Sequence, residues 1–421
     1  MKIGKYSFGT GDRFAHQGEA QLKALMQASK ELGIEIVPIW NKSNREHTIV
    51  RSTPADTRKE ADAAIKALRY KGDYYVDADH INLTNVDKFM ADSDFFTLDV
   101  ADFIGKKAAQ ADIDAFIEAN RKYIGNLYIP GIDKPFDVRK ELLTNITEKF
   151  LFAVQEAGKI YRHIKAAKGA DTFVAEVSMD EVNDAQSPVE MFFILSAIAG
   201  EKIPAQTIAP KFTGRFNKGV DYVGDINRFT KEFEEDLLVI DFAVQQFGLP
   251  ENLKLSIHSG SDKFSIYPII GELIRKYDKG IHIKTAGTTW LEEVIGLAMS
   301  EDEEAIDLVK AIYSGAVGRF DELCGPYATV IEIDKEKLPS SKVVEQWTGE
   351  KLANTLRHIP GHADYNPHFR QLIHIGYKVA AEYGNEFTGA LKMHRGIVGQ
   401  QVFENIYGRH IMKMFSPQIK K

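Results

Sequence analysis

Two histidines in the second half of the chain follow a pattern typical of metal or polyol sites. His258 and His282 are carried by two apolar, strand-like runs, Leu253–Ile257 and Ile281–Thr285, at or near the downstream end of each. Each run leads into a polar loop that contains glycine, and then into a helical pattern. In barrels of parallel strands the catalytic groups lie at these strand ends, and imidazole is a common metal ligand.

Carboxylates follow other strand-like runs in the same way. Asp79 and His80 come directly after a strand near Tyr74, where they could supply a base and a metal ligand, although Asp also favours helix N-caps and turns. Glu176 lies within an apolar strand. Burying a charged carboxylate there costs free energy unless it is paired with a cation or binds a metal ion, or unless it is a general acid with a raised pKa. Asp180 and Glu181 are interpreted as acids of a first helical turn.

Cationic and small polar residues near the same strand ends could bind an anionic or hydroxylated ligand. Lys284 shares a strand face with His282, because strand side chains alternate, so both should point into the barrel. The alternatives are a solvated basic loop at Lys211 and a hydrogen-bonded core histidine at His258. The predicted ligand-binding residues are Lys211, Arg215, Ser259, Lys263 and Lys284.

Strand and helix signals alternate along the chain, which predicts parallel strands joined by right-handed crossovers. The fold class we expect is α/β, a TIM-like (β/α)8 barrel over 1–300, with a helical insertion at about 100–170 and a mostly helical C-terminal extension over 301–421 packed on the barrel. The expected strands are Tyr6–Gly9, Ile34–Ile39, Tyr74–Asp77, Phe95–Leu98, Thr172–Val177, Gln206–Pro210, Leu253–Ile257 and Ile281–Thr285.

Composition excludes several classes of protein. The formal net charge is −7 and no basic stripe stands out, which argues against nucleic acid as a partner. The single cysteine, Cys324, allows neither an internal disulfide framework nor a thiolate metal cluster. No apolar run approaches the roughly 18 residues of a membrane span, and the start lacks a signal peptide's apolar core. We therefore expect a cytoplasmic protein without a membrane partner, with homo-oligomerisation left open.

Four segments resemble the tagaturonate epimerase family. They are Ser7–Phe14, Lys211–Asp225, His258–Ser265 and His282–Trp290. The resemblance implies a metal-dependent barrel enzyme that interconverts D-tagaturonate and D-fructuronate in hexuronate breakdown.

The resemblance also implies roles for residues of this chain. Asp79 would be the base and Glu176 the proton donor, with His80, His258 and His282 as ligands of a divalent metal ion. Histidine and carboxylate ligands suit Zn, Mn, Fe, Co or Ni.

The inverted carbon lies one bond beyond the carbon alpha to the ketone, so its hydrogen is not acidified and a retro-aldol route is expected. Three other functions stay open at this point. They are an epimerase of neutral ketohexoses such as tagatose or fructose, a metal-dependent aldolase or ketose isomerase, and a non-enzymatic sugar-binding protein.

Overall fold

Eight parallel strands form a closed barrel in this computed structural model, which describes residues 1–417 except 261 and 286. Around the barrel the strands follow the order β1-β10-β9-β8-β7-β4-β3-β2. Every predicted strand overlaps an observed one, so the predicted barrel is confirmed. The strands are β1 (Tyr6–Gly11), β2 (Ile36–Ser43), β3 (Tyr75–Ile81), β4 (Phe95–Asp99), β7 (Val174–Ser178), β8 (Thr207–Ala209), β9 (Lys254–His258) and β10 (Ile281–Thr285).

Helices cover the outside of the barrel because each presents an apolar stripe to the strands. The helix over Gly18–Leu32 ends where Gly33 adopts a left-handed conformation with φ of 65°, which glycine tolerates without a Cβ clash. Between β3 and β4 the connection has only a 3₁₀ turn, Val86–Phe89. The covering helices are α1 (Gly18–Leu32), α3 (Pro54–Leu68), α5 (Lys140–Lys168), α6 (Pro188–Gly200), α7 (Ile226–Phe247) and α8 (Tyr267–Lys276).

The end of the chain returns to the barrel and fills the gap between α8 and α1. Helix α17 (Arg395–Glu404) and the π-helical turn η6 (Asn405–Ile411) contact α1, and α18 (Met412–Phe415) contacts α8. Val402, Ile406 and Phe415 belong to the same hydrophobic core as the barrel helices. The segment expected as one C-terminal extension thus contains the helix that completes the ring.

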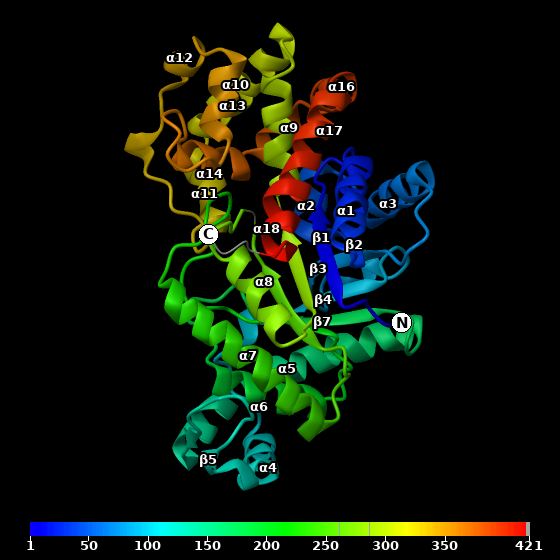
Figure 1. Ribbon diagram of the computed structural model, residues 1–421, viewed down its shortest axis with the longest axis vertical. Coiled ribbons are helices and arrows are strands. Elements are labelled where there is room, and N and C mark those ends of the chain that lie inside the picture. Colours follow the sequence, from blue (N-terminus) through cyan, green and yellow to red (C-terminus); the bar gives the residue numbers. More distant parts are fainter. Residues whose placement is uncertain (261, 286, 418–421) are drawn as a thin grey trace.

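Residues between β10 and α17 form a helical layer at one end of the molecule (Figure 1). They have their own core, which includes Trp290, Tyr313, Phe369 and Tyr377. The predicted helical character of this segment is confirmed. Its helices are α9 (Thr288–Ala298), α10 (Glu303–Gly318), α11 (Phe320–Cys324), α12 (Ser341–Val344), α13 (Gly349–Leu356), α14 (Pro367–Ile375), α15 (Tyr377–Glu382) and α16 (Asn385–Met393).

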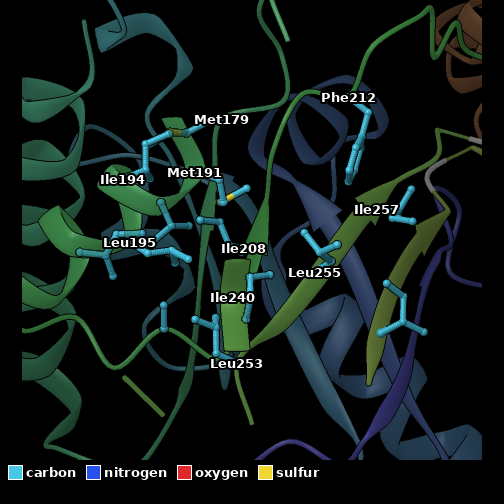
Figure 2. Packing of buried hydrophobic residues seen from close by; sticks show 14 of the residues in the cluster. Met179, Met191, Ile194, Leu195, Ile208, Phe212, Ile240, Leu253, Leu255 and Ile257 are labelled. Carbon is cyan, nitrogen blue, oxygen red and sulfur yellow. The ribbon is translucent and has the colours of Figure 1, made fainter. Parts of the chain in front are cut away.

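The insertion between β4 and α5 lies at the opposite end of the molecule (Figure 1). It contains α4 (Gln110–Ala119) and an antiparallel pair of short strands, β5 (Gly125–Leu127) and β6 (Phe136–Val138). Figure 2 shows the core between α6 and the neighbouring strands, where Met191 and Leu195 face Ile208 and Leu253. Among the described helices, none combines the length and apolar character needed to cross a membrane.

Candidate active site

The barrel interior changes from apolar at the amino ends of the strands to charged at their carboxyl ends. A buried apolar cluster fills the lower layer, formed by Ile3, Val37, Ile39, Tyr75, Phe95 and Val174. Further along the strands, Asp77, Asp79, Glu176 and Lys284 all point inward, because inward positions recur at every second residue. A charged site therefore lies at the end of the barrel where parallel-strand enzymes place their chemistry.

Lys284 is the centre of this charged layer. Its side chain is 2% exposed, and its Nζ lies 2.8 Å from Asp77 Oδ2, 2.9 Å from Asp79 Oδ1 and 3.1 Å from Glu176 Oε1. Nζ also donates a 2.6 Å hydrogen bond to Thr97 Oγ1. The sequence predicted that Lys284 points into the barrel, and it does, but its ammonium is occupied by carboxylates rather than left for a ligand.

The three carboxylates around Lys284 differ in their acidity. Burial raises the pKa of Asp77 to about 7, more than the Lys284 charge lowers it. Burial acts in the same direction on Asp79 and Glu176, but the ammonium of Lys284 and a neighbouring imidazole hold the pKa of each below its usual value. Asp79 and Glu176 are therefore ionised at neutral pH.

A β-bulge explains how Asp79 and His80, adjacent in sequence, reach the same site. In a regular strand their side chains would point to opposite faces, but the register of β3 against β4 shifts between Ala78 and Ile81. His80 takes a left-handed backbone conformation with φ of 52°, unusual for a residue with a side chain. The shift lets His80 Nδ1 lie 2.7 Å from Asp79 Oδ1 while its Nε2 faces the barrel mouth.

His80, Asp180 and His258 form a group that could hold a metal ion. His80 Nε2 lies 3.5 Å and His258 Nδ1 3.2 Å from Asp180 Oδ1, and the three candidate ligand atoms are within 4.8 Å of one another. Both nitrogens are buried and face the Asp180 carboxylate. Asp79 and Glu176 contact the other nitrogen of each ring, the arrangement that orients metal-binding histidines.

Asp180 is a site residue that the sequence interpretation missed. It was assigned to the first turn of a helix, but α6 begins only at Pro188, with Ser187 and Glu190 forming the capping box. Asp180 lies instead in the loop directly after β7, held by a 2.6 Å hydrogen bond from Ser178 Oγ. Burial raises the pKa of Asp180, but His258 and His80 outweigh burial and lower it well below the usual value.

The structure does not bring His282 to this group. Its side chain is fully buried one inward position below Lys284, and its Nδ1 lies 3.0 Å from Ser7 Oγ. Its ring packs against Phe95, a residue of the apolar layer, with centroids 5.5 Å apart. Burial lowers the pKa of His282 to about 3, so the ring is neutral. Of the three predicted ligands, His80 and His258 therefore lie in one group with Asp180, and His282 lies outside that group.

Glu176 lies behind the site rather than on its surface. The residue is fully buried, with Oε1 2.8 Å from His258 Nε2 and 3.1 Å from Lys284 Nζ. It does not line the cavity described below, so a bound ligand would not touch it. This position suits a residue that orients His258 and Lys284, and it does not suit the direct proton donor that was expected.

Lys263 and Ser259 hold the loops around the site together instead of facing a ligand. Lys263 Nζ is buried and donates hydrogen bonds to the backbone oxygens of Asn217 and Val220, at 3.0 and 2.7 Å. Ser259 Oγ donates to the backbone oxygen of Lys284 at 3.1 Å. The polar groups of Lys263 and Ser259 are thus used by the backbone and neither residue lines the cavity, so the structure gives no support to their predicted role in substrate binding.

Arg215 also differs from the prediction. Its exposed guanidinium forms a 2.5 Å ion pair with Glu332 of the C-terminal layer, and the residue does not line the cavity. Lys211 does line the cavity, as the prediction of a ligand-binding residue requires. The loop after β8 therefore faces the cavity at Lys211 and the outer surface at Arg215.

A cavity of about 510 Å³ opens above the charged layer. Its walls come from loops after several strands and include Asp79, His80, Asp180, His258 and Lys284. The C-terminal layer contributes two further lining residues, Tyr327 and Val330. The cavity thus joins a candidate metal group and an ionised carboxylate to space large enough for a small molecule.

Comparisons with known proteins identify the family and the fold of this chain. A sequence model of the family UxaE, tagaturonate epimerase, matches residues 1–406. The tagaturonate/fructuronate epimerase of Thermotoga maritima is 29% identical over 384 residues, covering 88% of this chain and 72% of that protein.

Two crystal structures of fructuronate-tagaturonate epimerase UxaE from Cohnella laeviribosi share the fold. The complex with one glycerol has a TM-score of 0.80 at 23% identity, covering 98% of this chain and 82% of that one. The complex with two glycerols has a TM-score of 0.81 at 22% identity, covering 99% and 83%.

Proposed function

The chain belongs to the tagaturonate epimerase family and is therefore an isomerase-class enzyme, and from this premise we propose that it interconverts D-tagaturonate and D-fructuronate with a divalent metal ion held by His80, Asp180 and His258. The observation that carries the metal proposal is the convergence of three candidate ligand atoms within 4.8 Å, two buried imidazole nitrogens and the carboxylate oxygen that they both face.

The donor set fits a catalytic metal ion. Two imidazoles and one carboxylate suit Zn, Mn, Fe, Co or Ni and leave coordination positions for a ligand. When bound, the ion would act as a Lewis acid toward the ketone and the adjacent hydroxyl of the sugar acid. The sequence-based expectation of a metal cofactor is thereby kept, with Asp180 in place of His282.

Asp79 is the residue we propose to take the proton from the hydroxyl of the carbon that is inverted. It lines the cavity and is held ionised by Lys284 and His80, so it is deprotonated and can accept a proton at neutral pH. Loss of this proton lets the neighbouring carbon–carbon bond break, leaving an aldehyde and an enediolate. The aldehyde turns, the bond reforms on its opposite face, and the new alkoxide takes the proton back from Asp79.

Glu176 and Lys284 act through their neighbours in this proposal. Glu176 Oε1 fixes the orientation of His258, and the Lys284 ammonium keeps Asp79 ionised from 2.9 Å away. The hydroxyl proton never has to reach Glu176, which is consistent with its position behind the cavity wall.

Two alternative activities share the same residues and are distinguished by products. A neutral ketohexose epimerase would invert tagatose or fructose at the same carbon, and an aldolase would release the two fragments. Family membership favours epimerisation of the sugar acids. A cytoplasmic location and homo-oligomerisation stay predictions.

The proposal is tested by following purified protein and D-tagaturonate by ¹H NMR, before and after removal of metal with a chelator. We expect D-fructuronate to accumulate, its formation to stop after chelation, and activity to return on adding one of the five divalent ions. Full activity in metal-free protein would refute the metal proposal. Accumulation of two three-carbon products would indicate an aldolase.

A further inference from the structure

Five cationic side chains line the cavity, and two of them are neutralised by the protein. Arg13 Nε forms a 2.9 Å ion pair with Glu46, and Arg13 Nη1 donates to the backbone oxygen of His374 at 2.7 Å. Lys284 is surrounded by three carboxylates. These two charges are therefore part of the framework and are not available to a bound anion.

The other three cations, Arg45, Lys211 and Lys218, have no carboxylate within ion-pair distance among the residues that the structure describes. Lys211 lies near the candidate metal group, since the charge of Asp180 acts on it, whereas Glu181 acts on both Lys211 and Arg45. Arg45 and Lys218 instead converge on one aromatic ring. The guanidinium carbon of Arg45 lies 5.3 Å, and Lys218 Nζ 5.9 Å, from the ring centroid of Tyr327.

Tyr327 is a rigid support for this pair. Its side chain is buried, and its hydroxyl lies 3.0 Å from the hydroxyl of Tyr377 in the core of the C-terminal layer. The backbone N–H of Lys218 donates a 2.8 Å hydrogen bond to the backbone oxygen of Val330, which fixes the loop beside Tyr327. Arg45 comes from α2 (Asn44–Val50) on another side of the barrel, so three separate segments meet here.

We propose that Arg45 and Lys218, supported by Tyr327, bind the carboxylate of the substrate and make the enzyme selective for sugar acids over neutral ketoses. This inference rests on the proposed function, because it concerns the substrate of the same cavity. Two unpaired cations from opposite sides can contact both oxygens of one carboxylate, with the guanidinium able to bind it bidentately. The cavity walls then offer a metal group for the ketone end and a cationic pair for the acid end.

The carboxylate contact has a second consequence for the reaction. When the bond between the carbon alpha to the ketone and the inverted carbon breaks, its electron pair passes to the ketone-bearing fragment as an enediolate. The other fragment is an aldehyde that carries the carboxylate. Arg45 and Lys218 would hold this aldehyde by its far end, so that it can turn about its own carbon–carbon bond without leaving the cavity.

The test compares D-tagaturonate with D-tagatose, which has a hydroxymethyl group in place of the carboxylate. We expect Arg45→Met and Lys218→Met each to raise KM for tagaturonate by about tenfold or more, the size of a lost charge-assisted hydrogen bond. The effect on tagatose should be smaller, so the preference for the acid falls, most in the double variant. The double variant should also release measurable three-carbon aldehyde acid.

Arg215→Met is the matched control, because Arg215 lies in the same loop as Lys218 but pairs with Glu332 outside the cavity. It should leave the preference unchanged, and thermal unfolding midpoints should show that all variants fold. Binding is measured separately by calorimetry with D-gluconate, an unreactive open-chain sugar acid, against sorbitol.

Each outcome of this experiment has one meaning. An unchanged preference for tagaturonate in the double variant, or unchanged gluconate binding, would overturn the inference. Absence of tagaturonate turnover in the wild-type protein would instead refute the proposed function, while loss of gluconate binding in the double variant would still support an acid-binding site at Arg45 and Lys218.

Discussion

Replacing Lys284 by methionine is the sharpest test of how the charged layer is built. The substitution keeps an unbranched side chain of similar length but removes the ammonium from among Asp77, Asp79 and Glu176, which lie 2.8 to 3.1 Å away. All four side chains are buried, so water cannot replace the lost charge. Removing one partner of a buried ion pair typically costs about 3–5 kcal/mol of unfolding free energy, and we expect that range here.

A second substitution shows how much of the cost of Lys284→Met comes from the contact with Asp77. Asp77→Asn removes one carboxylate while keeping an acceptor for Thr97 Oγ1, which donates to Asp77 Oδ1 at 3.0 Å. In the Lys284→Met/Asp77→Asn protein the cost should be smaller than the sum of the single costs by about 1–3 kcal/mol, because each single substitution already removes the same contact between Lys284 and Asp77. Urea denaturation followed by circular dichroism gives all four free energies.

Lys284→Met should also lower the activity of the enzyme. Lys284→Met should lower kcat by about 100-fold or more, the range expected when a catalytic base loses its proper ionisation. The double variant should not regain this activity, because Asp79 still lacks the ammonium. A single Lys284→Met variant within 1 kcal/mol of wild type, with kcat unchanged, would refute the reasoning.

Three further results follow from the same structure. In D₂O the retro-aldol route predicts no deuterium at the inverted carbon by NMR, and incorporation there would show direct deprotonation instead. Glu176→Gln keeps an acceptor for His258, so as a positioning residue it should lower kcat by about tenfold or less, whereas Asp79→Asn should lower it by about 100-fold or more; equal losses would restore Glu176 as a proton carrier. Burial lowers the pKa of Lys254 to about 7 in the folded protein. Between pH 7 and about pH 10 this lysine is therefore protonated in the unfolded chain but not in the folded protein. Its contribution to the unfolding free energy should rise with pH over that range, by up to about 1.4 kcal/mol per pH unit. Lys254→Met lacks this contribution, so urea denaturation should show the unfolding free energy of wild type rising relative to that of the variant between pH 7 and pH 9.5. A difference that stays constant with pH would contradict the lowered pKa of Lys254.

The barrel could be predicted from the sequence because its signals are local. Strand β10 has the predicted boundaries, Ile281–Thr285, since the pattern of apolar residues that marks a strand acts within a few residues. The return of α17 and α18 to the gap beside α1 could not be predicted in this way. That packing depends on a chain reversal after about a hundred residues, and helical periodicity does not say which surface an apolar face will cover.

Only part of the site could be predicted, because local sequence signals place a residue on a strand but do not give its depth in the barrel. Asp79, His80 and His258 were placed correctly at the cavity because each lies at the carboxyl end of a strand. His282 was misplaced because period-two alternation gives the face of a strand but not the depth within the barrel. Asp180 was missed because an acid after a strand looks the same whether a helix starts at once or, as here, only at Pro188.

The cationic residues show most clearly what could not be predicted from the sequence. Lys263, Lys284 and Arg215 have the residue type that binds a sugar acid, but each is already paired by the fold. Arg45 carries no distinguishing local pattern in the sequence, and only its approach to Tyr327 marks it out. Which charge stays unpaired is a property of the whole fold, because its partners come from distant segments.

The central claim, that His80, Asp180 and His258 hold a catalytic metal ion, is tested most directly by the metal content of three purified proteins. Elemental analysis should find close to one divalent ion per chain in the wild type and in His282→Ala, and much less in Asp180→Ala. A metal-free wild-type protein that still interconverts the two sugar acids would contradict the claim. So would an Asp180→Ala protein that keeps its metal while His282→Ala loses it, which would restore the three-histidine ligand set.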